Sequence, residues 1–506
     1  MRSKRFLYNN ISAILGQIIT IVCGLILPKA MMKGFGSEIY GATTSIADFL
    51  GYIALIEGGI GGVARAALYK PLAEKNFHEI NKIVASIQQF FRKIAIIFIG
   101  YTLVIACSYS YIAKDYPFDW GFTFWLVIII SFSSLAEYYF GITYSVLLQA
   151  DQKRYITQSL QSITIILNTI LACILIYFEC NILTVKLSYC VIHGIRIIIL
   201  NKYIKNNYYL KKMPAQNGYL SQKWDGMGQH IAFFLHSKTD IAVLTLFMNL
   251  REVAVYSVYN YIVSSLVALS TSFVSGVESV FGDMLAKNEK DNLNHFFNII
   301  ELVVHTICII FFSTAAIMIM PFIKLYTNGI SDADYYRPEI AYVMLLAEAF
   351  FCFRQPYGQL ATAAGKFKET KNAAFIEAAL NIVLSCIFAY FYGVVGIVTA
   401  TLIAMTYKTA YYVYYMSKYV IERKALLFVK RLTLTCINTG VIFLVCRLLP
   451  FQFETIKNYF EWVLYSVMTV CISGSITVAF SYIFYKQEWK QLVTQITGSV
   501  RSILIH

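Results

Sequence analysis

The residues in this sequence that could do chemistry are charged side chains set inside long apolar runs. An ionisable group at the centre of a bilayer costs about 3 kcal/mol on insertion scales, so such a group normally faces a partner or a water-filled cavity. We expect the cations to bind an anionic substrate and the acids to bind a coupling ion, H⁺ or Na⁺. The cations are Lys238, Arg354, Arg65 and Lys408, and the acids are Glu57, Asp240, Asp48, Glu137 and Glu348.

Spacing along an ideal helix limits which of these side chains share a face. Asp48 and Glu57 are nine residues apart, which places them on opposite faces. Glu57 and Arg65 are eight residues apart, about 80° in projection and roughly 12 Å along the axis, so one wall can carry both. A second set of charges lies nearer the ends of the apolar runs. The simpler explanation for these residues is that their side chains extend to the membrane surface. It comprises Arg196, Glu278, Glu301 and Glu377, and Arg65 shares this position.

Three short motifs interrupt the apolar runs. In HSKTDIAV at 236–243, Lys238 is predicted to hold a substrate anion and Asp240 a coupling ion or an opposing base. The alternative is a mutually neutralised Lys and Asp pair between helices. In FCFRQPYGQ at 351–359, Pro356 is expected to kink the helix and free carbonyl groups to line a cavity. The glycines of EGGIGG at 57–62 follow no strand, so close helix packing explains them better than a phosphate loop.

His305 lies four residues after Glu301, so the two side chains share a helix face. The pair is predicted either to relay protons or to form a packed hydrogen bond between helices.

The elements that must position these residues are membrane-spanning helices. Of the 506 residues, 58% are hydrophobic and 14% charged, against roughly a quarter charged in a soluble protein. The sequence predicts an all-α integral membrane protein of about 14 transmembrane helices. The predicted spans are 8–28, 38–63, 91–112, 120–148, 156–178, 182–201, 229–248, 253–280, 296–320, 338–362, 373–391, 395–416, 431–449 and 461–485.

The distribution of basic residues predicts the orientation. Basic residues in the first or last five positions of a span are counted with the adjoining loop. Of the 42 Lys and Arg residues, 29 then lie in the termini and the loops after even-numbered helices, 9 in the other loops and 4 deeper inside spans. Because cytoplasmic loops are enriched in Lys and Arg, both termini are expected to be cytoplasmic.

Similar short motifs recur between the two halves of the chain. Tyr40 aligns with Tyr256 at a separation of 216, and Asn168 with Asn381 at 213. We therefore expect two pseudo-symmetric six-helix bundles with a substrate cavity between them. The expected domains are 1–228 (bundle and linking loop), 229–420 (second bundle) and 421–506 (two further helices).

Composition and motifs argue against several other functions. The net charge is +14, but the Lys and Arg residues are spread between apolar segments and do not cluster on one face. Nucleic acid is therefore not an expected partner. The eleven cysteines lie singly in apolar runs without metal-ligand spacing. No catalytic or nucleotide-binding motif is present, so we expect no enzyme activity, cofactor or metal.

Several segments resemble one family of membrane transporters. They are RFLYNNISAILGQ at 5–17, GFGSEIYG at 34–41, the acid and glycine of Glu57–Gly59, Arg65, and KTDIAVLTLF followed by REVAVYSVYNYI with Asp240 and Tyr256. The chain resembles the polysaccharide transporters, the O-antigen and capsule flippases of the multidrug/oligosaccharidyl-lipid/polysaccharide exporter superfamily.

The resemblance implies export of a polyprenyl-diphosphate-linked saccharide: an O-antigen, capsule or exopolysaccharide repeat unit. It would be flipped by alternating access from the cytoplasmic to the outer leaflet of the bacterial inner membrane. The implied partners are this lipid-linked saccharide, membrane lipids, H⁺ or Na⁺, and the glycan polymerase and chain-length machinery. The chain departs from a strongly cationic cavity because its deep acids outnumber its deep cations.

Three alternatives remain open at this point: a drug or cation extruder of the same fold, a membrane glycan polymerase or ligase, and a scaffold in a glycan-assembly complex. The two last helices are expected to support the lipid tail, since their charges Arg447, Lys457 and Glu461 lie near the outer connection. A role as padding for the second bundle is the alternative.

Overall fold

The computed structural model describes residues 2–57, 60–113, 117–211, 213–215, 227–274, 276–449 and 456–489. Every regular element in these ranges is helical, as predicted. The helices of the first half are α1 (Arg2–Phe35), α2 (Ser37–Gly51), α3 (Ala54–Glu57), α4 (Ile60–Glu74), α5 (Phe77–Ile112), α6 (Trp120–Ala136), the π-helix η1 (Glu137–Gly141), α7 (Ile142–Ala150), α8 (Arg154–Tyr177) and α9 (Ile182–Asn207). Then follow α10 (Met227–Phe247), α11 (Leu250–Ser272), α12 (Val277–Ala286), α13 (Lys290–Tyr326), α14 (Pro338–Ala363), α15 (Phe367–Tyr419), α16 (Leu426–Leu448) and α17 (Tyr459–Phe484).

The predicted helix count fits these elements. Within the described residues, 11 helical segments are long and apolar enough to cross a membrane. That set leaves out α10 and α14 and counts α15 once. Gly393 breaks α15 with φ of 58° and ψ of −138°, so α15 is two helices. With this division and with α10 and α14 added, the helices roughly fit the predicted fourteen. Glycine suits this break, since it adopts positive φ without steric cost.

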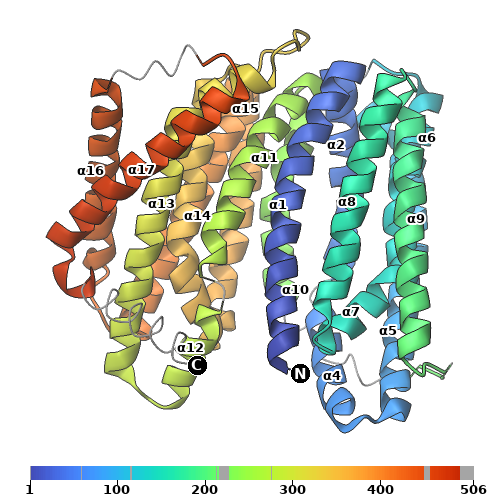
Figure 1. The fold of residues 1–506 in the computed structure, drawn as a ribbon, viewed down its shortest axis with the longest axis horizontal. Helices are drawn as coiled ribbons and strands as arrows, with labels where there is room; N and C mark the ends of the chain where they lie inside the picture. The colour runs from blue at the N-terminus through green and yellow to red at the C-terminus, as the bar shows by residue number, and fades with distance from the viewer. Residues whose placement is uncertain are drawn as a thin grey trace. The chain divides into compact units, whose positions relative to one another are not determined.

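The chain forms two compact units, described here separately. Unit 1 contains residues 1–258 and 329–333. In it α1 packs along α8, α8 against α9, and α9 against α6 (Figure 1). Unit 2 contains residues 259–328 and 334–506. In it α14 packs on α15, while α13 packs on α14, α16 and α17.

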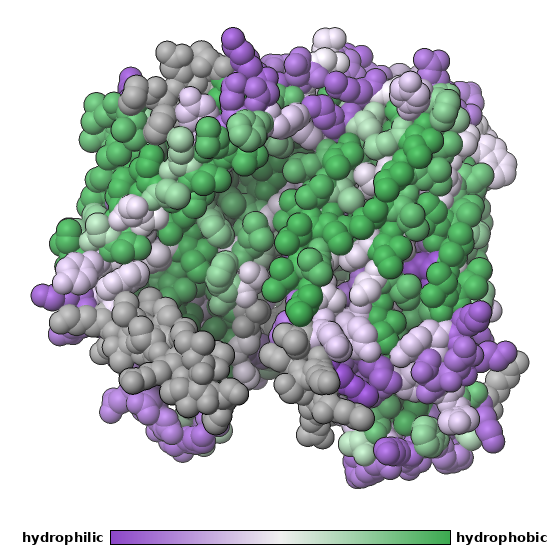
Figure 2. All heavy atoms as spheres, viewed as in Figure 1, coloured by the Kyte–Doolittle hydropathy of each residue, from purple (hydrophilic) through white to green (hydrophobic). Residues whose placement is uncertain are grey.

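The surfaces of the helices are those of a lipid-facing protein. On the face shown in Figure 2, apolar side chains cover the mid-lengths of α1, α8 and α9, and hydrophilic ones gather toward the helix ends. Ile14 on α1 and Ile198 on α9 are among the exposed apolar side chains, at 63% and 66%. Lipid replaces water as solvent for such surfaces, and helices satisfy their own backbone hydrogen bonds within it.

The buried face of the last helix, α17, carries small polar side chains. Thr469, Ser473, Thr477 and Ser481 recur every fourth residue along α17 and are all buried. Small side chains on one stripe allow close approach between helices in a membrane. This stripe explains how α17 packs tightly against α13.

The polar motif at 236–243 and the proline at 356 were expected to distort their helices. The motifs at 236–243 and at Pro356 both lie inside continuous helices, α10 and α14. The kink expected at Pro356 stays a prediction. A departure from α-helical geometry lies at η1, where Glu137 begins a π-helical turn. Such turns are rare and often lie at functional sites.

Candidate functional site

A buried carboxylate held by two cations lies inside unit 2. Arg354 on α14 donates from Nη1 to Glu377 Oε1 at 2.8 Å, and Lys408 forms an ion pair with Glu377 Oε2. Glu377 and Lys408 come from the two sides of the Gly393 break in α15. The three side chains are nearly inaccessible, since Arg354 is 5%, Glu377 0% and Lys408 9% exposed. One negative charge meets two positive charges, so the Arg354–Glu377–Lys408 cluster carries a net charge of about +1 with both bases protonated.

This cluster brings together two of the four predicted substrate-binding cations. The expectation that Glu377 reaches to the membrane surface is wrong, because Glu377 is fully buried between its partners. Its position inside the apolar run 373–391 was the available signal, since a carboxylate there needs cationic partners. Glu348 lies on α14 with Arg354 and is partly buried.

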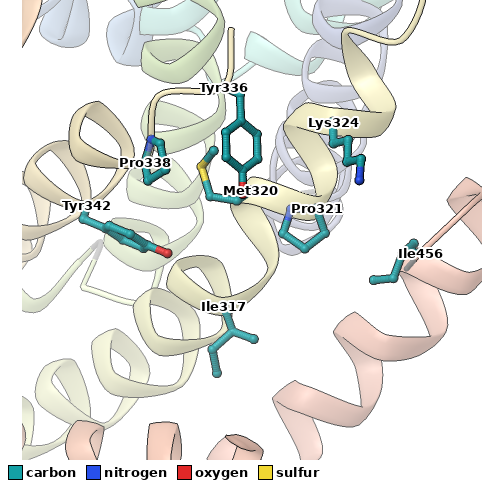
Figure 3. A pocket seen from close by; sticks show the side chains of 8 residues that line it. All are labelled: Ile317, Met320, Pro321, Lys324, Tyr336, Pro338, Tyr342 and Ile456. Carbon is teal, nitrogen blue, oxygen red and sulfur yellow. The ribbon is translucent and has the colours of Figure 1, made fainter. Parts of the chain in front are cut away.

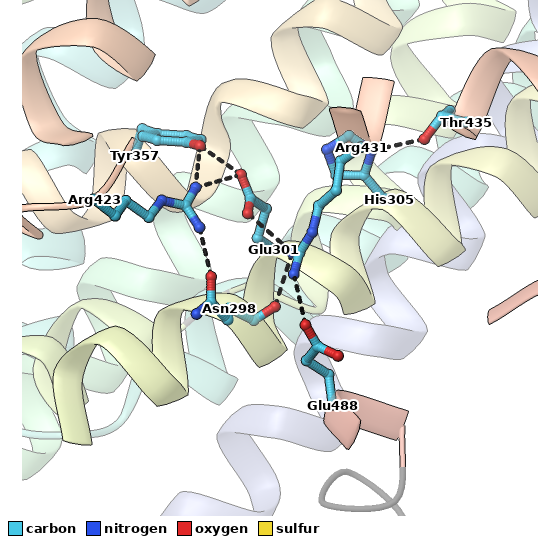
Figure 4. A network of polar contacts seen from close by, with 8 residues as sticks. All are labelled: Asn298, Glu301, His305, Tyr357, Arg423, Arg431, Thr435 and Glu488. Atoms are coloured by element: carbon cyan, nitrogen blue, oxygen red, sulfur yellow. Dashed lines mark hydrogen bonds and ion pairs between the residues drawn. The ribbon is translucent and has the colours of Figure 1, made fainter. Parts of the chain in front are cut away.

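A second buried carboxylate in unit 2 is also held by two cations (Figure 4). Glu301 on α13 pairs with Arg423 at 2.8 Å and with Arg431 at 2.9 Å, and it accepts the hydroxyl of Tyr357. Burial disfavours the Arg423 cation, but the charge of Glu301 outweighs that cost and raises the pKa of Arg423. Glu301 is 0% exposed, so the expectation that it reaches to the membrane surface is also wrong.

The surroundings of Glu301 tie the last two helices to the body of unit 2. Arg431, near the start of α16, also donates to the carbonyl of Asn298 at 2.9 Å and lies 3.7 Å from Glu488, which follows α17. His305 bonds through Nδ1 to Thr435 Oγ1 on α16 at 2.9 Å. Of the two roles predicted for His305, the geometry matches the packed hydrogen bond between helices.

In unit 1, Lys238 and Asp240 use different partners. Lys238 forms an ion pair with Asp48 on α2, whereas Asp240 accepts a hydrogen bond from the Tyr256 hydroxyl at 2.8 Å. Lys238 therefore forms a neutralised Lys and Asp pair between helices, as the alternative expects, and its partner is Asp48. Asp48 is 8% exposed at its side chain and Lys238 35%, so the pair has one buried and one accessible end.

In unit 1, Glu57 contacts Tyr138, which is the residue after Glu137 in the sequence. Tyr138 donates its hydroxyl to Glu57 at 3.4 Å, while the adjacent Glu137 binds Arg196 and lies 3.3 Å from His193 Nε2. The helix expected from Asp48 through Glu57 is divided into α2 and α3, and α4 begins at Ile60. The face assignments based on one continuous helix are therefore wrong.

Arg65 differs from the other three predicted cations. It donates to Gln149 Oε1 on α7 at 3.2 Å and forms no ion pair with any carboxylate in the described part of the chain. A Cβ added at Gly61 would lie 3.5 Å from its Nη1, so the guanidinium lies back over the glycines of its own helix. Arg65 is the predicted cation whose charge is least compensated.

A pocket of about 660 Å³ opens in unit 2 where α13 ends and α14 begins (Figure 3). Its polar side chains are Lys324, Tyr336 and Tyr342. Its remaining lining residues are Ile317, Met320, Pro321, Pro338 and Ile456. No group of three His, Cys, Asp or Glu side chains suited to a metal ion occurs in the ranges that the structure describes.

Comparison with known proteins identifies the fold. Residues 228–387 match the MatE family. The structure is similar to lipid II flippase MurJ in an inward closed conformation, with a TM-score of 0.70 and 18% identity over 95% of this chain and 99% of that chain. It is also similar to an inward-facing multidrug resistance MATE transporter of the MOP superfamily, with a TM-score of 0.57 and 13% identity over 79% and 95% of the two chains.

A third similar structure is the Vibrio cholerae MATE transporter VcmN, with a TM-score of 0.55 and 14% identity over 83% of this chain and 98% of that one. No curated protein sequence matches the chain significantly. At these identities the comparisons establish a shared fold: the chain has the architecture of MurJ and the MATE transporters.

Proposed function

We propose that this chain flips a polyprenyl-diphosphate-linked saccharide, an O-antigen, capsule or exopolysaccharide repeat unit, from the cytoplasmic to the outer leaflet of the bacterial inner membrane. The observation that carries the proposal is the net positive Arg354–Glu377–Lys408 cluster inside a chain with the fold of MurJ. A diphosphate is anionic, and guanidinium and ammonium groups are the side chains that bind it best.

The Arg354–Glu377–Lys408 cluster can hold an anion without losing its own pairing. A guanidinium has five N–H donors and an ammonium has three, whereas Glu377 occupies only part of each set. Glu377 keeps both cations placed while the site is empty, because unpaired charges at this depth are costly. A phosphate can then accept hydrogen bonds from the remaining N–H groups of Arg354 and Lys408, and the ion pairs need not separate first.

Arg65 is the second candidate contact for the anion. Its guanidinium has a neutral partner, Gln149, so binding a phosphate there requires no carboxylate to be displaced. Lys238 is a weaker candidate, because Asp48 already compensates its charge. We propose Arg354, Lys408 and Arg65 as the principal substrate cations and Lys238 as an auxiliary one.

Transport by this chain is proposed to be coupled to H⁺ or Na⁺ through Glu57 and Asp240. Each carboxylate accepts a tyrosine hydroxyl, from Tyr138 and Tyr256 respectively, and a carboxylate is an oxygen ligand that can also bind a cation. Asp48, Glu137 and Glu348 are further candidates, although Asp48 and Glu137 already have cationic partners. The proposed topology places both termini in the cytoplasm, and glycan polymerase and chain-length machinery are proposed neighbours.

Export in cells tests the substrate contacts. Arg354→Ala, Lys408→Ala and Arg65→Ala are each expected to reduce glycan export at the surface while the protein stays in the membrane. Arg354→Lys, which retains the charge, is expected to retain more export than Arg354→Ala. Full export by the Arg354→Ala, Lys408→Ala double variant would remove this cluster from substrate binding.

A drug or cation extruder is the second candidate function. It is favoured by the similarity to MATE transporters and by the two acids of unit 1, Glu57 and Asp240, that accept tyrosine hydroxyls. Growth in the presence of cationic dyes separates the two functions. An extruder predicts dye sensitivity on gene deletion with normal surface glycan, and a flippase predicts the reverse.

A further inference from the structure

A groove of about 410 Å³ lies between α1 and α8 on the surface of unit 1. The two helices lie side by side in Figure 1, and apolar side chains cover their mid-lengths in Figure 2. The groove is lined by exposed apolar side chains, with Ile11 at 45%, Leu15 at 54% and Ile163 at 53%. Its walls are therefore open to a hydrocarbon chain and are not part of a packed core.

Small side chains give the groove its depth. Ser12, Ser159 and Ser162 lie among the longer apolar side chains of its lining. At Gly16 the two helices approach so closely that an added Cβ would lie 3.2 Å from Ser162 Oγ. Ser12 donates its hydroxyl to Gln158 Oε1 at 3.0 Å, and Ser162 donates to the Gln158 carbonyl at 2.9 Å. These two hydroxyls are thus satisfied within the protein, so an apolar chain can lie over them without leaving them unpaired.

The length of the groove matches one leaflet of a bilayer. Its lining on α1 runs from Tyr8 to Ile19, a rise of roughly 16 Å at 1.5 Å per residue. The hydrocarbon core of a bilayer is about 30 Å thick, so one leaflet contributes about 15 Å. This length suits the acyl chain of a phospholipid, whereas a long polyprenyl chain would extend beyond the groove.

The end of the groove nearest the N-terminus is fixed by hydrogen bonds between α1 and the start of α8. The rings of Tyr8 and Tyr155 lie there, with centroids 5.7 Å apart. Asn9 donates to the carbonyl of Gln152 at 3.0 Å and accepts the backbone N–H of Tyr155 at 2.8 Å. The first N–H groups of a helix lack partners within it, so Asn9 supplies one of them to α8.

Cations gather at this end of the groove. Arg5, one turn before Tyr8, and Lys153 share the carboxylate of Asp151 at 3.3 and 2.7 Å. One acid compensates two cations, so this group carries a net charge of about +1, and each cation keeps N–H donors that Asp151 does not use. Arg154, the first residue of α8, is exposed and forms no ion pair in the described part of the chain. The positive charge therefore complements an anionic headgroup.

We propose that this groove binds a phospholipid with an anionic headgroup, in the leaflet nearest the N-terminus of α1. One acyl chain lies between α1 and α8, and the headgroup phosphate lies against Arg5 and Lys153. The lipid is held and is not carried across the membrane, so the proposal goes beyond the proposed function and does not depend on it. Because both helices contact the lipid, its binding is expected to stabilise unit 1.

Native mass spectrometry of the delipidated full chain tests the headgroup contact. The probes are phosphatidylglycerol and phosphatidylcholine with the same acyl chains. The parent protein is expected to bind phosphatidylglycerol roughly tenfold more tightly, because charge-assisted contacts favour the anionic headgroup. The Arg5→Gln, Lys153→Gln double variant is expected to lose this preference. Lys202→Gln, an exposed site on α9 at the same end of unit 1, is the control and is expected to keep it.

Two changes at Ser159 test whether the groove is the place of binding. Ser159→Phe fills the groove from an exposed position and is expected to weaken both lipids, whereas Ser159→Ala leaves the groove open and is expected to bind like the parent. Parental binding by Ser159→Phe would overturn the site, as would equal binding of the two lipids to the parent protein. If a polyprenyl diphosphate displaces phosphatidylglycerol and depends on Ser159 in the same way, the groove holds the substrate lipid and the proposal is wrong.

Discussion

Arg354 on α14 and Lys408 on α15 are 54 residues apart in the chain, and both pair with the one carboxylate of Glu377. The position of each cation depends on the same acid, and the acid is fully buried. Removal of one member therefore alters the charge and the position of the other two. This coupling sets the pattern of variant behaviour expected in unit 2.

Glu377→Gln is expected to destabilise the protein more than Arg354→Gln does. The first change leaves two buried cations without a carboxylate, whereas the second leaves a Lys408–Glu377 pair of zero net charge. Breaking a buried ion pair costs about 3–5 kcal/mol. Thermal unfolding of the purified variants in detergent measures the difference. Equal unfolding temperatures for the two variants would contradict the pairing.

The Asp48–Lys238 pair of unit 1 is expected to behave as one energetic unit. Asp48→Asn and Lys238→Gln should each lower stability, and the double variant should be more stable than the sum of the single effects predicts. A coupling free energy of about 0.5–3 kcal/mol is the normal range for contacting residues. Additive effects would mean that the two side chains act independently. Asp240→Asn is the control, since Asp240 is bonded to Tyr256.

The last two helices are expected to be required for the stability of unit 2, not only for export. Truncation after Arg423 removes Arg431 and the Trp462 bond to Met318, while Glu301 keeps Arg423. Arg431→Met tests the charge alone, since it retains both helices. Both proteins should unfold at lower temperature than the parent, the truncation more so. A truncated chain with parental stability and export would show that α16 and α17 are only padding.

The predicted orientation is tested by cysteine labelling in intact cells. Asp332 is a poor reporter, because its carboxylate accepts the backbone N–H of Ser37 at 2.6 Å and the Ser37 hydroxyl at 2.7 Å. The neighbouring Ser331 is exposed, and Asn207 at the end of α9 is exposed as well. In a cysteine-free background, an impermeant thiol reagent should label Ser331→Cys but not Asn207→Cys. The opposite pattern would reverse the topology.

Coupling to an ion gradient is expected to depend on Glu57 and Asp240. Glu57→Gln and Asp240→Asn should keep substrate binding but lose the acceleration of transport by an imposed proton or sodium gradient. Flipping rates in vesicles with and without each gradient provide the measurement. If the parent protein flips lipid equally fast in all conditions, the chain is a facilitator and both acids have structural roles.

The sequence predicted the helices well because apolar length is a local property. Even the break near Gly393 was predicted, between the spans 373–391 and 395–416. Ion pairs were harder to predict, because they join helices that are distant in the chain. Glu301 and Arg423 are 122 residues apart, and nothing in either local segment specifies the other. Arg423 lies between spans, so a search confined to charges inside apolar runs omitted it.

The continuous-helix assumption also limited the prediction of faces. The division between α2 and α3 places Asp48 and Glu57 on separate helices, so their angular separation could not be read from their spacing. Partner identity decided which predicted cations remain suited to a substrate. Lys238 pairs with an acid, whereas the partner of Arg65 among the described residues is the neutral Gln149. This distinction depends on packing between helices and is absent from single-sequence patterns.

The most direct test of the central claim is flipping by the purified chain in vesicles. A fluorescent polyprenyl-diphosphate disaccharide is placed in both leaflets. An external quencher or glycosidase reaches the outer-leaflet molecules at once and the inner-leaflet molecules only after they cross. Vesicles with the parent protein are expected to lose nearly all of the fluorescence, from both leaflets. Vesicles with the Arg354→Ala, Lys408→Ala double variant are expected to lose only the half that comes from the outer leaflet. Loss limited to the outer half with the folded parent protein, with or without an ion gradient, would contradict the account.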